Sequence, residues 1–423
     1  MIIAIVTIVW IVINLIITVD RTERQKVCLK RWLDANGHGS IVACTGFGKT
    51  RVALNLVDAF VTKNPQSHTL VVVPTQVLKD QWITQVDERG LGLNVCVEII
   101  NTVIKFDWSV DLLIIDEAHR AVAQSLVKVF ERVQYSYILG LTGTLERLDM
   151  RHLLLDRYAP VCDRITLEEA EKEGWVATHK EYAVMLNVDL TDYNAWNIRF
   201  NKAFAFFNFE FDVAMKAATD FTVRSKIAKH LGVDVKMVAA MGMEFVRSLK
   251  ARKEFIMNHP KKIEVAKKII AAKKDHKILT FSGTIKQSEA IGVGWVMHSK
   301  KSKKINAETV DAFNKAKSGV LNTSKAADEG LDIDGVDTEI ILHTDSSKIR
   351  KGQRLGRSIR FKEGKTAEIF TLILAGTQET KWLANSKISK VITITEDQLD
   401  KLLAGEEIVT RERQFTENLE FRF

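Results

Sequence analysis

The chain has 423 residues, 46% of them hydrophobic and 27% charged, with four prolines and no Gly/Ser-rich tract. A disordered chain is excluded, long flexible linkers are not expected, and the length predicts two or three domains. The net charge of +8 favours a polyanionic partner such as nucleic acid, although a solvated lysine surface accounts for it equally well. Four cysteines without a C-x-x-C pair, Cys28, Cys44, Cys96 and Cys162, predict a reducing compartment and no structural zinc.

The first 19 residues carry no charged side chain. Their length and polarity match a membrane-spanning helix, and they lack the basic leader of a secretory signal. The basic residues from Arg21 to Arg31 would then keep the rest of the chain on the cytoplasmic side. The alternative is a buried strand that leads into the first domain, because β-branched residues dominate the stretch.

Strands and helices alternate along the first part of the chain. Strands are expected at 40–45, 68–75, 110–119 and 135–144, and helices at 51–63 and 76–90, with a glycine loop at 46–50. Alternation of buried strands and helices predicts a parallel, doubly wound α/β sheet, whose ligands bind at the carboxyl ends of the strands.

The pattern changes near residues 165–180, and the stretch from about 190 to 258 favours helix. Alternation then returns, with a strand ending at 282–284 and further strands at 294–299, 318–324, 338–344 and 367–374. We therefore predict an apolar segment at 1–20, an α/β domain at 21–180, a helical segment at 181–258, a second α/β domain at 259–395 and a tail at 396–423.

The stretch ACTGFGKT, residues 43–50, lies between a predicted strand and a predicted helix. Glycines let backbone N–H groups converge on phosphate oxygens, and the helix N-terminus adds partial positive charge. Lys49 would neutralise the β- and γ-phosphates, and the Thr50 hydroxyl would bind Mg²⁺. The residues expected to hold the nucleotide are Thr45, Gly46, Phe47, Gly48, Lys49, Thr50 and Arg51. A glycine turn with a chance lysine is the alternative.

The stretch DEAH, residues 116–119, closes an apolar strand. Asp116 would hold the Mg²⁺ shell, and Glu117 would orient and deprotonate an attacking water. An acidic pair after a strand is a weak signal alone, but a phosphate loop upstream turns it into a two-part signature of ATP hydrolysis.

The ordered set ACTGFGKT, DEAH, LTGT (141–144) and QRLGRSIR (353–360) resembles superfamily 2 helicases and translocases. The chain is similar to the DEAD/DEAH-type members, and most of all to phage UvsW-like and RecG-like DNA helicases, over residues 24–385. The resemblance implies two tandem RecA-like parallel-sheet domains with a mainly helical segment between them. It also implies ATP and Mg²⁺ as cofactors and a cytoplasmic location, in the host if the chain is phage-encoded.

The resemblance further implies roles for individual residues. Gln25 would read adenine, while Gly330 and Asp332 would face the nucleotide. Candidate contacts to the nucleic-acid backbone are Thr75, Gln81, Thr102, Ser282, Thr323 and Ser324, and candidate coupling residues are His119, Thr142 and Thr144. Trp82 is expected in the core.

In QRLGRSIR, the resemblance places Arg357 and Arg360 against the departing γ-phosphate, with Gln353 touching phosphate or water. Such arginine fingers accelerate other NTPases by about 10³ to 10⁵. The alternative is a basic exposed helix.

Two further features leave alternatives open. The lysine-rich stretches between 250 and 304 either line a nucleic-acid track or solvate helix faces. The aromatic cluster FAFFNFEF, residues 204–211, is favoured as the core of the helical segment over a stacking wedge.

The sequence therefore predicts an ATP-dependent helicase or translocase, acting on DNA in preference to RNA, with branched, forked or duplex intermediates as substrates. An RNA helicase and a translocase that does not separate strands remain alternatives. So does a membrane-anchored ATPase that does not act on nucleic acid. A binding module without turnover is disfavoured because Glu117 and Arg357 are both present.

Overall fold

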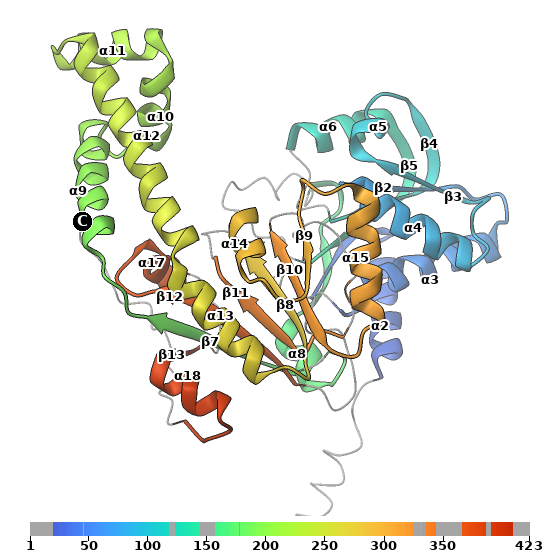
Figure 1. Ribbon diagram of the computed structural model, residues 1–423. Helices are drawn as coiled ribbons and strands as arrows, with labels where there is room; N and C mark the ends of the chain where they lie inside the picture. The colour runs from blue at the N-terminus through green and yellow to red at the C-terminus, as the bar shows by residue number, and fades with distance from the viewer. Residues whose placement is uncertain are drawn as a thin grey trace, which may run out of the picture. The chain divides into compact units, whose positions relative to one another are not determined.

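Figure 1 shows a computed structural model of the chain, which describes residues 20–44, 46–117, 123–143, 157–176, 178–324, 333, 335–343, 366–385 and 391–408. The chain divides into two compact units, and the main boundary lies between His179 and Lys180. Of the later described residues, 333, 335–337 and 366–367 also group with the first unit. We describe each unit by itself. Residues 1–19, where a membrane anchor or a leading strand was expected, lie outside the described residues. Within the residues that the structure describes, no helix is long and apolar enough to cross a membrane.

The first unit is built on a six-stranded parallel sheet in the order β3-β2-β4-β5-β1-β6. Its strands are β1 (His38–Ala43), β2 (Thr69–Val73), β3 (Val95–Ile99), β4 (Trp108–Asp116), β5 (Val133–Thr142) and β6 (Val161–Ile165). Its helices are α2 (Arg21–Asp34), α3 (Lys49–Lys63), α4 (Gln76–Glu88), α5 (Ile100–Val103), α6 (Ala123–Arg132) and α8 (Leu167–Lys172). The expected α/β alternation is confirmed.

Helices on both faces explain the continuous apolar strands. Successive strand residues point to opposite faces, so Val71 and Val73 pack in one core, and Leu70 and Val72 pack in the other. A strand such as β2, buried at every position, is typical of a parallel sheet covered on both sides.

The second unit contains a seven-stranded sheet in the order β13-β7-β12-β11-β8-β10-β9. Its strands are β7 (Thr178–Leu186), β8 (Lys277–Ser282), β9 (Trp295–Met297), β10 (Gly319–Ser324), β11 (Thr338–Ile341), β12 (Thr366–Leu374) and β13 (Val391–Thr395). The helices α13 (Pro260–Ala272), α14 (Ile285–Ala290), α15 (Lys303–Lys315), α17 (Gln378–Asn385) and α18 (Glu396–Leu403) belong to this unit. The predicted second α/β domain is therefore confirmed.

A buried ion pair joins α13 to α17, and its lysine also reaches the residue after β11. The Lys262 ammonium donates to Glu379 Oε1 at 2.7 Å and to the Leu342 carbonyl at 2.8 Å. Both side chains are fully buried. Burial lowers the pKa of Lys262, against the opposing effect of the Glu379 carboxylate.

Two boundaries differ from the expectation. The helical segment was predicted from residue 181, but Thr178–Leu186 forms strand β7, because it pairs in parallel with β13 more than 200 residues later. That partner cannot be read from local periodicity. The expected tail begins with a helix, α18, whose N-terminus carries a Thr395–Gln398 capping box.

Residues 191–258 form a bundle of four helices, which we call the helical arm. It contains α9 (Thr191–Phe206), α10 (Phe211–Thr219), α11 (Phe221–Leu231) and α12 (Val235–Asn258), and the four helices extend away from the second sheet in Figure 1. The arm has its own apolar core around Phe245. The core assignment of the aromatic cluster is confirmed for Phe204 and Phe207, whereas Phe209 keeps 60% of its surface exposed.

Candidate nucleotide-binding site

The glycine loop joins β1 to α3 and has the backbone of a phosphate loop. Gly46 and Gly48 have φ angles of 88° and 94°, a region that favours glycine. A Cβ atom at Gly48 would lie 2.8 Å from Gln25 Nε2. Lys49, the first residue of α3, donates from Nζ to the Ala43 carbonyl at 3.0 Å. The lysine of the loop is therefore hydrogen-bonded to the end of β1, at the N-terminus of a 15-residue helix.

Helix α2 holds the carbonyl side of this loop. Gln25 Nε2 and Arg21 Nε each donate to the Phe47 carbonyl at 2.9 Å, and Arg21 also donates to the Gly46 carbonyl. The Gln25 Oε1 atom is buried and has no hydrogen-bond partner within the described residues. Burial, and then the charge of Arg51, lowers the pKa of Arg21. Sequence analysis missed Arg21, although its place four residues before Gln25 puts both on one face of α2.

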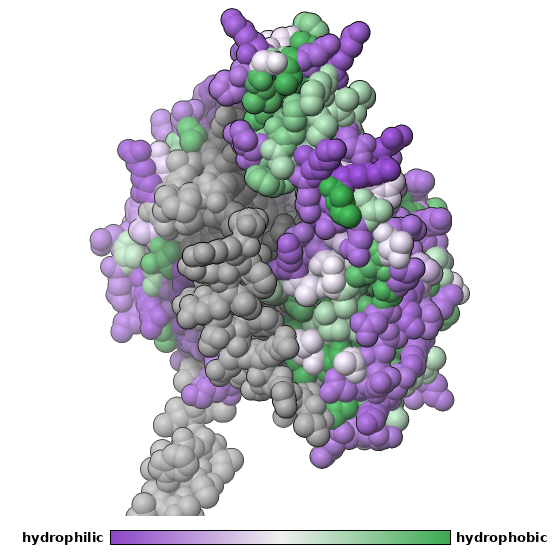
Figure 2. All heavy atoms as spheres, turned by 90° about the vertical axis from the view of Figure 1, so that its left-hand side faces the viewer, coloured by the Kyte–Doolittle hydropathy of each residue, from purple (hydrophilic) through white to green (hydrophobic). Residues whose placement is uncertain are grey.

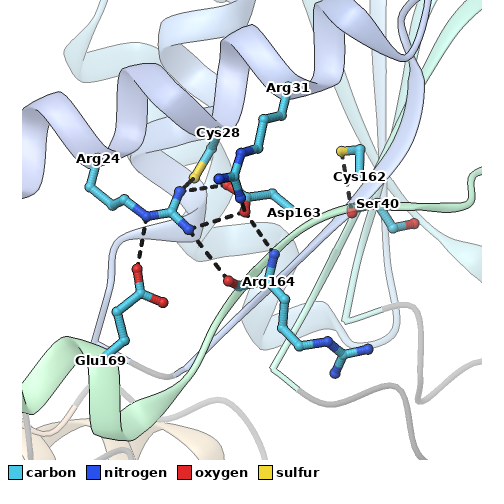
Figure 3. Close-up of polar contacts among 8 residues, drawn as sticks. All are labelled: Arg24, Cys28, Arg31, Ser40, Cys162, Asp163, Arg164 and Glu169. Atoms are coloured by element: carbon cyan, nitrogen blue, oxygen red, sulfur yellow. Dashed lines mark hydrogen bonds and ion pairs between the residues drawn. The ribbon is translucent and has the colours of Figure 1, made fainter.

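A charged cluster fixes α2 to β6 and α8 (Figure 3). Arg24 binds both oxygens of Asp163, at 2.5 and 3.0 Å, and its Nε donates to Glu169 at 2.9 Å. Arg31 and the backbone N–H of Arg164 donate to the same carboxylate. Burial opposes ionisation of Asp163, but the hydrogen bonds led by Arg24 prevail and lower its pKa. The cluster therefore sets where Gln25 and Arg21 meet the loop.

The two acids end strand β4. Trp82 of α4, 1% exposed, donates from its indole N–H to Asp116 Oδ2 at 2.8 Å, and the backbone N–H of Glu117 donates to Asp116 Oδ1 at 2.9 Å. Burial, and after it the charge of Glu117, raises the pKa of Asp116 to about 6, while Trp82 and Lys49 lower it. Glu117 has a φ of 48°, a strained value for a residue other than glycine.

The strand register brings these groups to one edge of the sheet. Strand β5 lies between β1 and β4, and its residues Thr142 and Leu141 pair with Val42 and Asp116. Asp116 and Thr142 thus end their strands at the same edge, where the phosphate loop follows β1 and Glu117 follows β4. Thr142 is fully buried at the end of β5, the strand between β1 and β4.

The donor set fits Mg²⁺ bound with a nucleotide. Within the part of the chain that the structure describes, no three or more His, Cys, Asp or Glu residues are grouped to hold a metal ion. One carboxylate, Asp116, and one hydroxyl, Thr50, are hard oxygen donors, and Mg²⁺ takes its other ligands from water and phosphate. Arg51 follows Thr50 on an exposed position of α3.

The candidate nucleic-acid contacts lie in several environments. The Thr75 hydroxyl caps α4 by accepting from the Leu78 N–H at 3.4 Å, and Gln81 and Thr102 are half-exposed on α4 and α5. Among the described atoms, the buried Ser282 hydroxyl at the end of β8 has no partner. The Thr323 hydroxyl donates to the Thr280 carbonyl at 2.6 Å.

Thr323 is fully buried, so its hydroxyl lies inside the second sheet and not at its surface. Ser324, the last residue of β10, lies at the strand end. The remaining predicted site residues lie outside the described residues: Thr45, His119, Thr144, Gly330, Asp332, Gln353, Arg357 and Arg360.

Two protein families match the chain. The family described as helicase conserved C-terminal domain matches residues 261–362, and the family described as type III restriction enzyme, res subunit, matches residues 18–102 and 94–147. The first match lies in the C-terminal half, and the second spans the phosphate loop and the DEAH stretch.

Individual relatives agree with these families. The DNA 3'-5' translocase XPB2 of Sulfurisphaera tokodaii is 27% identical over 85% of this chain and 83% of its own. A candidate ATP-dependent RNA helicase of African swine fever virus is 31% identical, over 28% of each chain. The ATP-dependent DNA helicase fml1 of Schizosaccharomyces pombe is 38% identical over 19% of this chain and 9% of its own.

Solved structures show the same fold. The helicase domain of Pyrococcus furiosus Hef has a TM-score of 0.51 at 15% identity, covering 86% of this chain and 98% of its own. Saccharomyces cerevisiae Dbp5 has a TM-score of 0.58 at 12% identity, covering 90% and 91%. The tandem RecA-like fold is therefore confirmed. The two family matches and the match to the translocase XPB2, together with the phosphate loop and the acidic pair, identify an ATP-hydrolysing helicase or translocase of superfamily 2.

Proposed function

We propose that the chain is a DNA motor that uses Mg²⁺ and ATP to move on, or remodel, branched, forked or duplex DNA. The observation that carries the proposal is one edge of the first sheet, where Asp116 ends β4 and the loop with Lys49 follows β1. Only β5 lies between these two strands. The relative matched over most of the chain is named as a DNA translocase, which supports DNA as the track.

Each residue of the site has a defined task in this proposal. Mg²⁺ supplies charge neutralisation for the phosphates when it is bound. Lys49 exchanges the Ala43 carbonyl for phosphate oxygens, and Asp116, held by Trp82, provides the carboxylate for the metal shell. Glu117 orients the attacking water and accepts its proton.

The residues beyond this edge complete the proposed cycle. Arg357 and Arg360 are assigned to the charge that develops on the γ-phosphate. Thr75, Gln81, Thr102, Ser282 and Ser324 are assigned to the sugar–phosphate backbone, where contacts are indifferent to sequence. A substrate range like that of UvsW-like or RecG-like helicases follows from the resemblance of the motifs.

RNA is the second candidate track, because the African swine fever virus relative is named as a candidate RNA helicase. Its match covers 28% of each chain, against 85% of this chain for the translocase. DNA is therefore favoured.

ATP hydrolysis by the full-length chain tests the proposal, measured with no nucleic acid, single-stranded DNA, duplex DNA, forked DNA and RNA. Glu117→Gln and Arg357→Ala should each abolish stimulated hydrolysis, while Glu88→Gln, an exposed acid at the end of α4, should not. Stimulation by RNA alone would replace DNA with RNA as the track. Hydrolysis that responds to none of the four would overturn the motor.

A further inference from the structure

The outer part of the helical arm contains a helix-turn-helix. Helix α11 ends at Leu231, and α12 begins at Val235, so three residues connect them. Short connections of this length, often with a glycine, are typical of helix-turn-helix units. The preceding helix α10 packs on both, which gives a three-helix arrangement.

The turn is built by its own residues. Gly232 has a φ of 66°, and the Val233 N–H reaches back to the Ala228 carbonyl at 3.1 Å, which closes α11. Asp234 then caps α12 by accepting from the Lys236 N–H at 2.8 Å. The chain direction is therefore fixed at both sides of the turn.

The inner faces of the three helices share one apolar core. Ala228 of α11 and Val238 of α12 are buried, with Ala214 and Ala217 of α10 beside them. A Cβ atom at Gly242 would lie 2.7 Å from the Ala217 backbone, so α10 and α12 touch almost backbone to backbone. Such close packing fixes which face of α12 points outward.

The outward face is cationic and apolar. Lys236, Met237 and Ala240 are exposed on the first turns of α12, with Met237 at 49%. Residues 221–243 hold four cationic side chains, Arg224, Lys226, Lys229 and Lys236, and one acid, Asp234, which is used as the cap. Figure 2 shows hydrophobic side chains beside hydrophilic ones on the arm, at the top of the view.

We propose that this unit docks in the major groove of duplex DNA, with the start of α12 as the inserted helix. The major groove is about 12 Å wide and admits an α-helix. Lysines can bind phosphates or guanine, and methionine and alanine can contact thymine methyl groups. The site is separate from the nucleotide loop and rests on the proposed function only in taking DNA as its partner.

Duplex DNA fits this face better than a single strand does. A single-strand track stacks successive bases on several aromatic rings. Residues 221–243 contain one phenylalanine, Phe221, and no tyrosine or tryptophan. The next phenylalanine, Phe245, is buried in the core of the arm. Duplex RNA does not fit, because its major groove is too narrow for a helix.

Binding of the full-length chain to a labelled 24-base-pair duplex, measured by fluorescence anisotropy without nucleotide, tests the proposal. Lys236→Ala with Met237→Ala should weaken DNA-duplex binding by about tenfold or more and make its salt dependence shallower by about one phosphate contact. Affinity for single-stranded DNA and for an RNA duplex of the same sequence should not change. Lys202→Ala, on an exposed position of α9 in the same arm, is the matched control, and Lys236→Arg should retain binding.

Methyl green, which occupies the major groove, should lower wild-type affinity to the level of the double variant and have no further effect on that variant. Unchanged duplex binding by the variant, or an equal loss on single strands or duplex RNA, would overturn the proposal. DNA-stimulated ATP hydrolysis is measured in parallel. Duplex binding that depends on Lys236 without any stimulation would refute the motor and leave the docking site standing.

Discussion

Trp82→Phe removes one hydrogen bond from the acid that is assigned to Mg²⁺. The indole N–H lies 2.8 Å from Asp116 Oδ2, and both side chains are buried. A hydrogen bond to a charged group contributes about 1.5–3 kcal/mol. At about 1.36 kcal/mol for each pKa unit, its loss raises the pKa of Asp116 by about one to two units.

The direction of the effect follows from which form the bond stabilises. The N–H stabilises the carboxylate, so the Trp82→Phe variant favours the protonated acid, which cannot bind the metal. From a pKa of about 6, the ionised fraction at pH 7 falls from about nine-tenths to between about one-half and one-tenth. The acid limb of the pH–rate profile, measured at subsaturating Mg²⁺, should therefore move to higher pH, and high Mg²⁺ should reverse the shift.

Trp108→Phe is the matched control, because Trp108 also loses one indole hydrogen bond, to the Val103 carbonyl at 3.1 Å, but lies at the opposite end of β4. Its profile should keep the wild-type limb. A Trp82→Phe profile that falls equally at every pH, with an unmoved acid limb, would refute the assignment and indicate a packing defect alone.

Three further variants test other contacts. Asp163→Asn should raise the KM for ATP more than it lowers kcat. In the wild-type chain, the lowered pKa of Asp163 should stabilise the fold above about pH 4, and this stabilisation should be lost as the pH falls below that value, as measured by urea unfolding. Lys262→Met should lower the free energy of unfolding by about 3–5 kcal/mol, because it removes the cation buried against Glu379. Lys262→Met with Glu379→Leu should recover much of that free energy in the same assay. Gly242→Val should open the arm to limited proteolysis while hydrolysis without nucleic acid persists, and an intact arm would contradict the close approach of α10 and α12.

The sequence predicted most of the strands because burial leaves a local mark. Strand β2 is apolar at four of its five positions, and glycines at 46 and 48 with Lys49 mark the loop before α3. Strand β7 was missed because its evidence is not local: Val391 pairs with Glu181, and no periodicity within either segment shows it. Strand pairing over such separations appears only in the folded sheet.

The site was predicted in part for a similar reason. Lys49 and Asp116 follow from residue types next to strands, but the support from Arg21 and the indole of Trp82 depends on how α2 and α4 pack. Trp82 was correctly placed in the core, yet burial alone did not reveal its polar task. Ala228, Gly232 and Val233 mark the turn of the helix-turn-helix in the sequence. The turn was missed because residues 190–258 were assigned to helix as a whole.

The length of helix α12 is close to the rise of one turn of duplex DNA. Its 24 residues, Val235–Asn258, span about 36 Å, and the exposed Lys236 lies in its first turn. The side chain of Asn258 accepts a hydrogen bond from Thr284 at 2.9 Å. Thr284 lies two residues after Ser282, a candidate contact to the nucleic-acid backbone. One turn of B-form DNA rises by about 34–36 Å. A duplex held at both ends of α12 would therefore be contacted twice on the same side, and hydroxyl-radical cleavage should show two protected patches about 10 base pairs apart.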